Sequence, residues 1–258
     1  MTNEAAPNEL RILVFGQSDA TGEHLADREQ AWPNLVAARL EEQHGRPVTV
    51  IVRPTYLHVA GVERYIGKEL ERQRPDIVIF TASTFAFAQR MVVVSVRRRF
   101  GDRPANAYNW LERRVDSRTR QSVVGSRANR IARRVLTKLL GAEPVATYEM
   151  VIEGTGLALA RMAEEEQLTT VVYQSNPLNA AERSPLILAQ LHQFDADLQA
   201  IARRLRLPYI DGRPALLADA DQSTMLFPDR LHYTTRAHSI LAETALAAFD
   251  DGRIPLPE

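Results

Sequence analysis

The chain has 258 residues, of which 45% are apolar, enough for the core of one large α/β domain or of two small ones. It contains no cysteine, which excludes disulfides, thiolate metal sites and a cysteine nucleophile. With 32 basic and 32 acidic residues the net charge is zero, so no overall charge attracts the protein to nucleic acid or to a membrane. The polar, acidic first residues and the lack of a long apolar run predict a cytoplasmic protein with no stable membrane anchor.

Short apolar runs alternate with helical patterns along the chain. The runs predict five strands, at residues 11–15, 48–52, 76–81, 169–173 and 207–211. Apolar residues at helical spacing predict helices at residues 32–40, 62–73, 147–167, 186–205 and 234–249. This alternation predicts one α/β domain over residues 1–258, a three-layer α/β/α sandwich with a mainly parallel five-stranded sheet.

A glycine-bounded turn directly follows the first predicted strand. Ser18 lies in this turn, between Gly16 and Gly22. A buried strand that ends in such a turn presents a hydroxyl at the carboxyl edge of the sheet, where active groups of parallel sheets gather. The pattern makes Ser18 a candidate nucleophile, although glycine and serine are also ordinary turn residues.

A second signal lies just before the last predicted helix. Asp229 and His232 are three residues apart there, so the carboxylate can orient the imidazole and the imidazole can deprotonate a serine. The remaining histidines show no metal-ligand spacing, which predicts surface or packing roles and no zinc enzyme. They are His24, His44, His58, His192 and His238.

The two signals resemble motifs of the SGNH (GDSL-type) hydrolases, a family with a flavodoxin-like fold. The matching segments are residues 16–22, Gly-Gln-Ser-Asp-Ala-Thr-Gly, and residues 229–232, Asp-Arg-Leu-His. The resemblance implies a serine esterase or acyl hydrolase for a small-molecule or carbohydrate ester, with Ser18 as nucleophile, His232 as general base and Asp229 as its orienting partner. It implies no cofactor and no metal. Gln17, where the family has Asp, resembles the Gly-Gln-Ser turn of some carbohydrate acetylesterases.

The chain departs from the family at the oxyanion hole. The family adds a glycine after the second strand and an asparagine after the third, and Phe85 stands in the place of that asparagine. Substitute oxyanion or substrate-binding groups are expected among the polar and glycine residues that follow the strands. The candidates are Gln17, Thr55, Gly61, Ser83, Thr84 and Asn176.

Three interpretations of this departure stay open. Thr55, Thr84 or Asn176 could supply the missing donors, residues 89–144 could build part of the hole, or the protein could bind ligands without hydrolysing them. An acyltransferase that uses the same triad is a further alternative.

Residues 89–144 form a predicted Arg-rich helical cap, inserted after the third strand. Between positions 90 and 140, 14 Lys or Arg residues stand against three acidic residues. One interpretation is an amphipathic lid whose charged face lies in solvent. The alternative, more specific interpretation is that the positive charge binds an anionic substrate or an acidic carrier protein. Nucleic acid is not an expected partner, because no groove-reading module is present and arginine replaces lysine throughout the chain.

Overall fold

The structure, a computed structural model, describes residues 9–119, 135–175, 185–219, 224–227 and 232–256. Its central sheet has five parallel strands in the order β2-β1-β3-β6-β7. The strands are β1 (Leu10–Gly16), β2 (Val48–Pro54), β3 (Ile77–Phe80), β6 (Thr169–Gln174) and β7 (Tyr209–Asp211).

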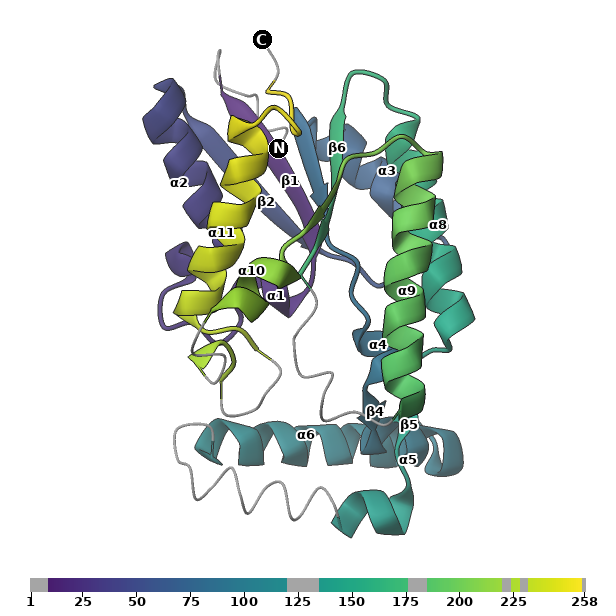
Figure 1. The fold of residues 1–258 in the computed structure, drawn as a ribbon. Helices are drawn as coiled ribbons and strands as arrows, with labels where there is room; N and C mark the ends of the chain where they lie inside the picture. The colour runs from purple at the N-terminus through teal and green to yellow at the C-terminus, as the bar shows by residue number, and fades with distance from the viewer. Residues whose placement is uncertain (1–8, 120–134, 176–184, 220–223, 228–231, 257–258) are drawn as a thin grey trace.

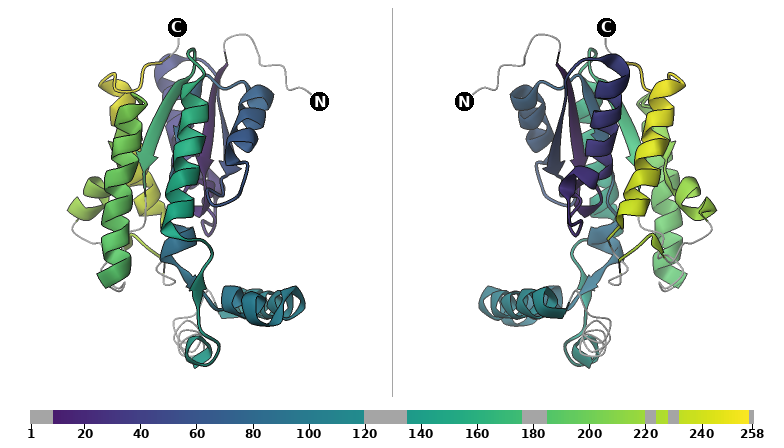
Figure 2. Two further views of the ribbon diagram at one scale, coloured as in Figure 1. Left: turned by 90° about the vertical axis from the view of Figure 1, so that its right-hand side faces the viewer. Right: turned by 90° about the vertical axis from the view of Figure 1, so that its left-hand side faces the viewer.

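Helices cover both faces of the sheet (Figures 1 and 2). The long ones are α2 (Trp32–His44), α3 (Val62–Gln73), α8 (Tyr148–Ala163), α9 (Pro185–Arg204) and α11 (Thr235–Asp250). The short ones are α1 (Ser18–Thr21), the 3-10 turn η1 (Arg28–Gln30), α4 (Phe85–Ala88) and α10 (Arg213–Ala218). The predicted three-layer α/β/α architecture with a parallel five-stranded sheet is therefore confirmed.

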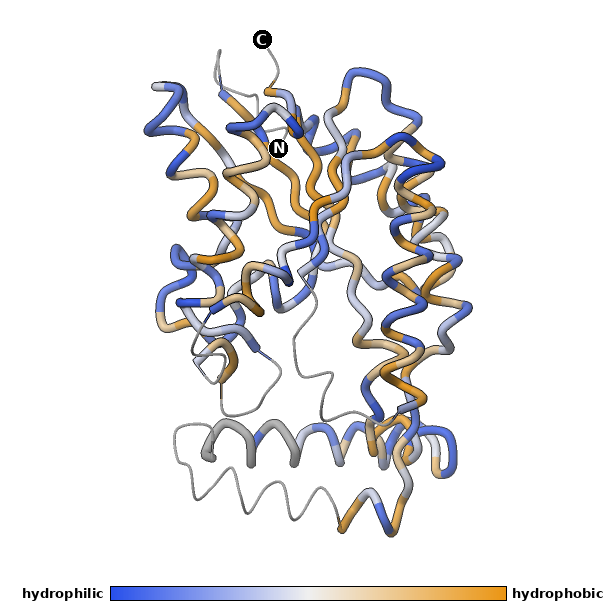
Figure 3. Tube along the Cα trace, in the orientation of Figure 1, coloured by the Kyte–Doolittle hydropathy of each residue, from blue (hydrophilic) through white to orange (hydrophobic). Residues whose placement is uncertain are grey.

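Side-chain alternation along the strands builds two separate cores. In β1, Ile12 and Val14 pack with residues of α2 and α11, whereas Leu13 and Phe15 pack with residues of α3 and α8. Successive side chains of a strand point to opposite faces, so a strand with helices on both sides buries apolar side chains on each face. Figure 3 shows the result, with hydrophobic strands in the middle and hydrophilic outer faces on the helices.

The strand order places the end of β1 at a topological switch point. β1 pairs with β2 on one side and with β3 on the other, so the chain leaves it in one direction and later crosses to the opposite side. In open parallel sheets the crevice at this point, outside the carboxyl ends of the strands, is where ligands bind. The turn that contains Ser18 lies there.

The segment after α4 lies beyond the carboxyl ends of the strands (Figure 1). It contains β4 (Arg90–Met91), α5 (Val92–Phe100), α6 (Asp102–Thr119), a helical stretch at residues 135–140 and β5 (Glu143–Pro144). β4 and β5 pair antiparallel, which holds the two ends of the segment together. Val92, Val93, Val96 and Ala105 form a small core of its own. The domain boundaries at 89 and 144 stay a prediction.

The short helices were not predicted. Ser18 was expected in a turn, and it begins the one-turn helix α1; α10 was not expected at all. Segments of four to six residues are too short to show a helical period, so their sequences cannot be told from turns. No helix in the described part of the chain is both long and apolar enough to cross a membrane.

The loop after β2 depends on a close approach of helix α8. A Cβ atom built on Gly154 would lie 1.7 Å from the carbonyl oxygen of Leu57, whereas one on Gly156 would meet only Ile201 Cδ1, at 3.9 Å. We expect Gly154→Ala to lower the free energy of unfolding by at least about 2 kcal/mol, because helix or loop must move. Gly156→Ala is the matched control and should raise it, by up to about 1 kcal/mol, through helix propensity. Denaturant unfolding of both variants measures this, and equal effects would contradict the packing.

A buried histidine on α11 makes the stability depend on pH. His238 is 1% exposed, and its Nδ1 accepts a hydrogen bond from the main-chain N–H of Trp32 at 3.2 Å. Burial lowers the pKa of His238 to about 4. An unfolded histidine has a pKa of about 6.5, so between pH 6.5 and 4 the unfolded state binds the extra proton. The contribution of the neutral ring is complete above pH 6.5 and is lost as the pH falls to about 4, by roughly 3 kcal/mol.

We therefore expect the free energy of unfolding to fall across this range in the wild type. His238→Asn keeps an acceptor near the Trp32 N–H without a titrating ring, so its slope should be shallower. Unfolding curves at several pH values between 4 and 7 compare the two proteins. Parallel pH profiles would show that His238 is not the responsible group.

Candidate active site

Ser18 is the first residue of α1 and is half-buried. The preceding Gly16 is needed for space, since a Cβ there would lie 2.6 Å from Ala20 Cβ and 2.7 Å from Thr81 Oγ1. Gly22 ends the helix with φ at 63°, a left-handed conformation that glycine adopts readily. Gly16 therefore lets the start of the serine turn lie close to Thr81, which follows β3, and Gly22 lets the chain turn away after α1.

The side chain of Gln17 joins three loops at the switch point. Its Nε2 donates to the carbonyl oxygen of Thr55 at 3.0 Å, after β2, and its Oε1 accepts from Ser83 Oγ at 3.0 Å, after β3. The orientation of the amide follows from chemistry, because only the nitrogen can donate to a carbonyl. Ser83 Oγ in turn accepts from the Phe85 N–H at 3.2 Å. Of the predicted site residues, Gln17, Thr55 and Ser83 are thus brought together beside Ser18.

The hydroxyl groups of these residues already have hydrogen-bond acceptors. Thr55 is buried and its Oγ1 donates to the carbonyl oxygen of Arg53 at 3.4 Å, while Ser83 donates to Gln17. Thr84 is buried at the N-terminal cap of α4. Gly61 is the N-terminal cap residue of α3, with φ at 79°. As oxyanion groups, all four stay predictions.

A chain of short hydrogen bonds connects the Ser18 turn to the C-terminal part of the site. Asp19 Oδ1 accepts from the Gln17 N–H at 3.1 Å, and Asp19 Oδ2 accepts from Ser175 Oγ at 2.6 Å. The carbonyl oxygen of Ser175 accepts from the Tyr233 hydroxyl at 2.8 Å. Burial and then the charge of Asp19 hold the pKa of Tyr233 well above its usual value, so the hydroxyl stays a donor. Tyr233 directly follows His232.

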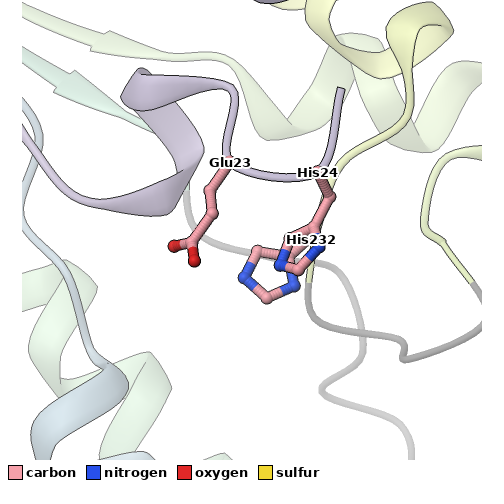
Figure 4. Close-up of side chains that lie close together, drawn as sticks. All are labelled: Glu23, His24 and His232. Carbon is pink, nitrogen blue, oxygen red and sulfur yellow. The ribbon is translucent and has the colours of Figure 1, made fainter. Parts of the chain in front are cut away.

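His232 is half-buried and lies next to the segment that leaves α1. Its ring centroid is 3.7 Å from that of His24, with 50° between the ring planes. Figure 4 shows the two rings with the carboxylate of Glu23 beside them. The sequence predicts a surface or packing role for His24, and the structure places its ring against that of the candidate base, 208 residues away in the chain. Asp229 and Asn176 lie outside the described residues.

Five residues of this region were not predicted as site residues. They are Asp19, Glu23, His24, Ser175 and Tyr233. A weak signal existed for two of them, since Asp19 follows the candidate nucleophile and Tyr233 follows the candidate base. The other three are recognised only through their neighbours in space.

Comparison of the sequence with known families identifies no relative. No protein-family model matches the chain, and no curated protein is significantly similar to it. Several solved structures have a similar fold. A lipase from a goat rumen metagenome, Lip_vut3, has a TM-score of 0.57 at 14% identity, over 93% of this chain and 97% of the lipase.

Two further structures match to a similar extent. A lipolytic protein of the G-D-S-L family from Veillonella parvula has a TM-score of 0.54 at 12% identity, over 93% of this chain and 98% of that protein. An acetyl-xylooligosaccharide esterase from Geobacillus, Axe2, has a TM-score of 0.53 at 12% identity, over 92% of this chain and 93% of the esterase. The chain therefore has the α/β/α fold of the SGNH (GDSL-type) hydrolases.

Proposed function

We propose that the protein is a serine hydrolase of carboxylic esters, with Ser18 as nucleophile, His232 as general base and Asp229 as the orienting partner. One observation carries the proposal, namely that the fold brings the surroundings of Ser18 and His232 together. The His24 and His232 rings are 3.7 Å apart, and Asp19, Ser175 and Tyr233 form a second connection. If Ser18 and His232 had only structural roles, their two segments would not need to meet at the topological switch point of the sheet.

The chemistry follows from these positions. The Ser18 oxygen attacks the acyl carbon while His232 takes its proton, and the imidazolium then returns that proton to the leaving alcohol. A water molecule, activated by the same base, releases the acid and restores the serine. The Ser18 N–H, in the first turn of α1, is the first candidate donor for the oxyanion, because N–H groups in the first turn of a helix have no intrahelical acceptor.

The oxyanion hole sets this chain apart from an ordinary esterase. Phe85 is 39% exposed at the start of α4, and the Thr55 and Ser83 hydroxyls donate elsewhere. Loss of one oxyanion donor costs about a hundredfold to a thousandfold in rate. This observation favours slow turnover of simple esters, and it keeps a ligand-binding protein without hydrolysis as the second candidate function.

For the substrate we propose a small-molecule or carbohydrate ester. The Gly-Gln-Ser turn and the similarity in fold to an acetyl-xylooligosaccharide esterase support a carbohydrate ester. The Arg-rich composition of residues 89–144 supports an anionic substrate or an acidic carrier protein, although in the last turn of α5 Arg97 and Arg98 already pair with Asp102 and Glu143. Transfer of the acyl group to another alcohol uses the same residues.

The nucleophile can be tested by labelling and by turnover. We expect a fluorophosphonate to label the wild type at Ser18, and Ser18→Ala to lose both the label and at least about a thousandfold of the rate on a short-chain aryl ester. Ser239→Ala is the matched control, because the Ser239 hydroxyl bonds only within α11. It should keep the label and the rate. Mass spectrometry of the labelled peptide locates the adduct.

Two results would count against the proposal. If Ser18→Ala kept more than about a tenth of the rate, another group would be the nucleophile. If the folded wild type bound an ester but neither reacted with the fluorophosphonate nor turned the ester over, the binding protein would be the correct assignment.

Gln17 is a positioning residue for the same site. Replacing it with Glu would put a carboxylate oxygen against the Thr55 carbonyl in place of a donor. We expect Gln17→Glu to lower the free energy of unfolding by about 1–3 kcal/mol and the ester rate by at least about tenfold, because the loops that flank Ser18 would shift. The exposed Gln43→Glu is the control and should change neither. Unfolding curves and initial rates measure both, and an unaffected Gln17→Glu would rule out the positioning role.

A further inference from the structure

Three side chains beside the candidate base form a cluster that can hold a metal ion. Glu23, His24 and His232 each offer one ligand atom, and these atoms all lie within 4.8 Å of one another. Glu23 and His24 come from the segment directly after α1, and His232 from the segment before α11. Figure 4 shows the two imidazole rings together, with the carboxylate of Glu23 beside them.

We propose that Glu23, His24 and His232 bind a divalent transition metal of the Zn²⁺ class, and that the bound ion inhibits the enzyme by occupying His232. The binding site stands on the cluster itself. Only the inhibition rests on the proposed hydrolase function, in which His232 is the general base.

The ligand set determines the class of ion. Two imidazole nitrogens and one carboxylate oxygen suit Zn²⁺ and its neighbours, whereas Mg²⁺ and Ca²⁺ prefer oxygen ligands throughout. Zn²⁺ binds imidazole nitrogen at about 2.0–2.1 Å, so two ligands of a tetrahedral site are about 3.4 Å apart. The donors of the cluster lie within 4.8 Å of one another, and the two rings, whose centroids are 3.7 Å apart, have to turn and separate until one nitrogen of each faces the ion. Three protein ligands leave the fourth position to water.

The cluster is also accessible and partly preorganised. Glu23 is exposed and both histidines are half-buried, so an ion can enter from solvent. His24 has φ at 138°, a backbone conformation that residues other than glycine rarely adopt. The Leu25 N–H donates to the Gly22 carbonyl oxygen at 3.0 Å, and the Phe227 ring lies 6.3 Å from the His24 ring. The turn that carries His24 is therefore formed before any ion binds.

Metal binding and base catalysis compete for the same ring. A nitrogen whose lone pair is bound to the ion cannot accept the Ser18 proton, and the positive charge makes the rest of the ring less basic. Removal of the ion by a chelator restores the neutral imidazole, so the inhibition is reversible. No covalent bond forms or breaks.

The experiment measures binding and inhibition separately on the tag-free full chain. Isothermal titration with Zn²⁺ should give one ion per chain for the wild type, and Mg²⁺ should give no binding. His24→Ala and Glu23→Gln should each weaken Zn²⁺ binding by at least about tenfold, since each removes one ligand. His192→Ala removes an exposed histidine of α9 and is the matched control, with wild-type affinity expected. Equal Zn²⁺ affinity in all four proteins, or none in the wild type, would overturn the site.

Inhibition is measured as the ratio of ester rates with Zn²⁺ and with EDTA, each protein serving as its own reference. Zn²⁺ should lower the rate of the wild type and of His192→Ala at least about tenfold, and His24→Ala should need at least about tenfold more Zn²⁺ for the same effect. A wild type that binds Zn²⁺ through these residues yet keeps its rate would overturn the inhibition. If Zn²⁺ binds as expected but the metal-free wild type neither hydrolyses esters nor reacts with a fluorophosphonate, the metal site stands and the hydrolase function fails.

Discussion

The arrangement of the site depends on how the end of β1 is held between its two neighbours. β1 is flanked by β2 and β3, and the chain leaves these strands through loops that meet at the same edge of the sheet. Gln17 spans that edge with one amide, donating to Thr55 and accepting from Ser83. Because the nitrogen and the oxygen of one amide make these two hydrogen bonds, the amide positions both loops relative to the serine turn.

The same principle operates on the C-terminal side of Ser18. Asp19 fixes its own turn through the Gln17 N–H and fixes the end of β6 through Ser175. Ser175 then holds Tyr233, next to the candidate base. One carboxylate thus accepts from its own turn at 3.1 Å and from the segment after β6 at 2.6 Å. These hydrogen bonds hold the residue after His232, and they involve neither the Ser18 side chain nor a substrate.

The ends of β6 and β7 are braced by a separate ionic cluster. Arg213 forms ion pairs with Asp195 of α9 and with Asp211 of β7, and Gln174 donates to Asp195 at 2.6 Å. These groups are mostly shielded from solvent, so their desolvation cost is offset only by the complete set of hydrogen bonds. The cluster connects α9, β6, β7 and α10 at the edge of the sheet opposite to β2. It does not include the residues at the end of β1, where the candidate site lies.

Much of the fold follows from the sequence alone. Continuous apolar runs such as β1 and β3 predict strands buried on both faces, and the helical spacing that begins at Trp32 and at Val62 predicts α2 and α3. The motifs around Ser18 and His232 indicate the candidate nucleophile and the candidate general base. The sequence could not reveal the tilted contact between the His24 and His232 rings, the two partners of Gln17, or the hydrogen bond from Ser175 to Asp19. Periodicity reports which face of an element is buried, whereas contacts between residues up to 208 positions apart are decided by strand order and loop geometry in the folded chain.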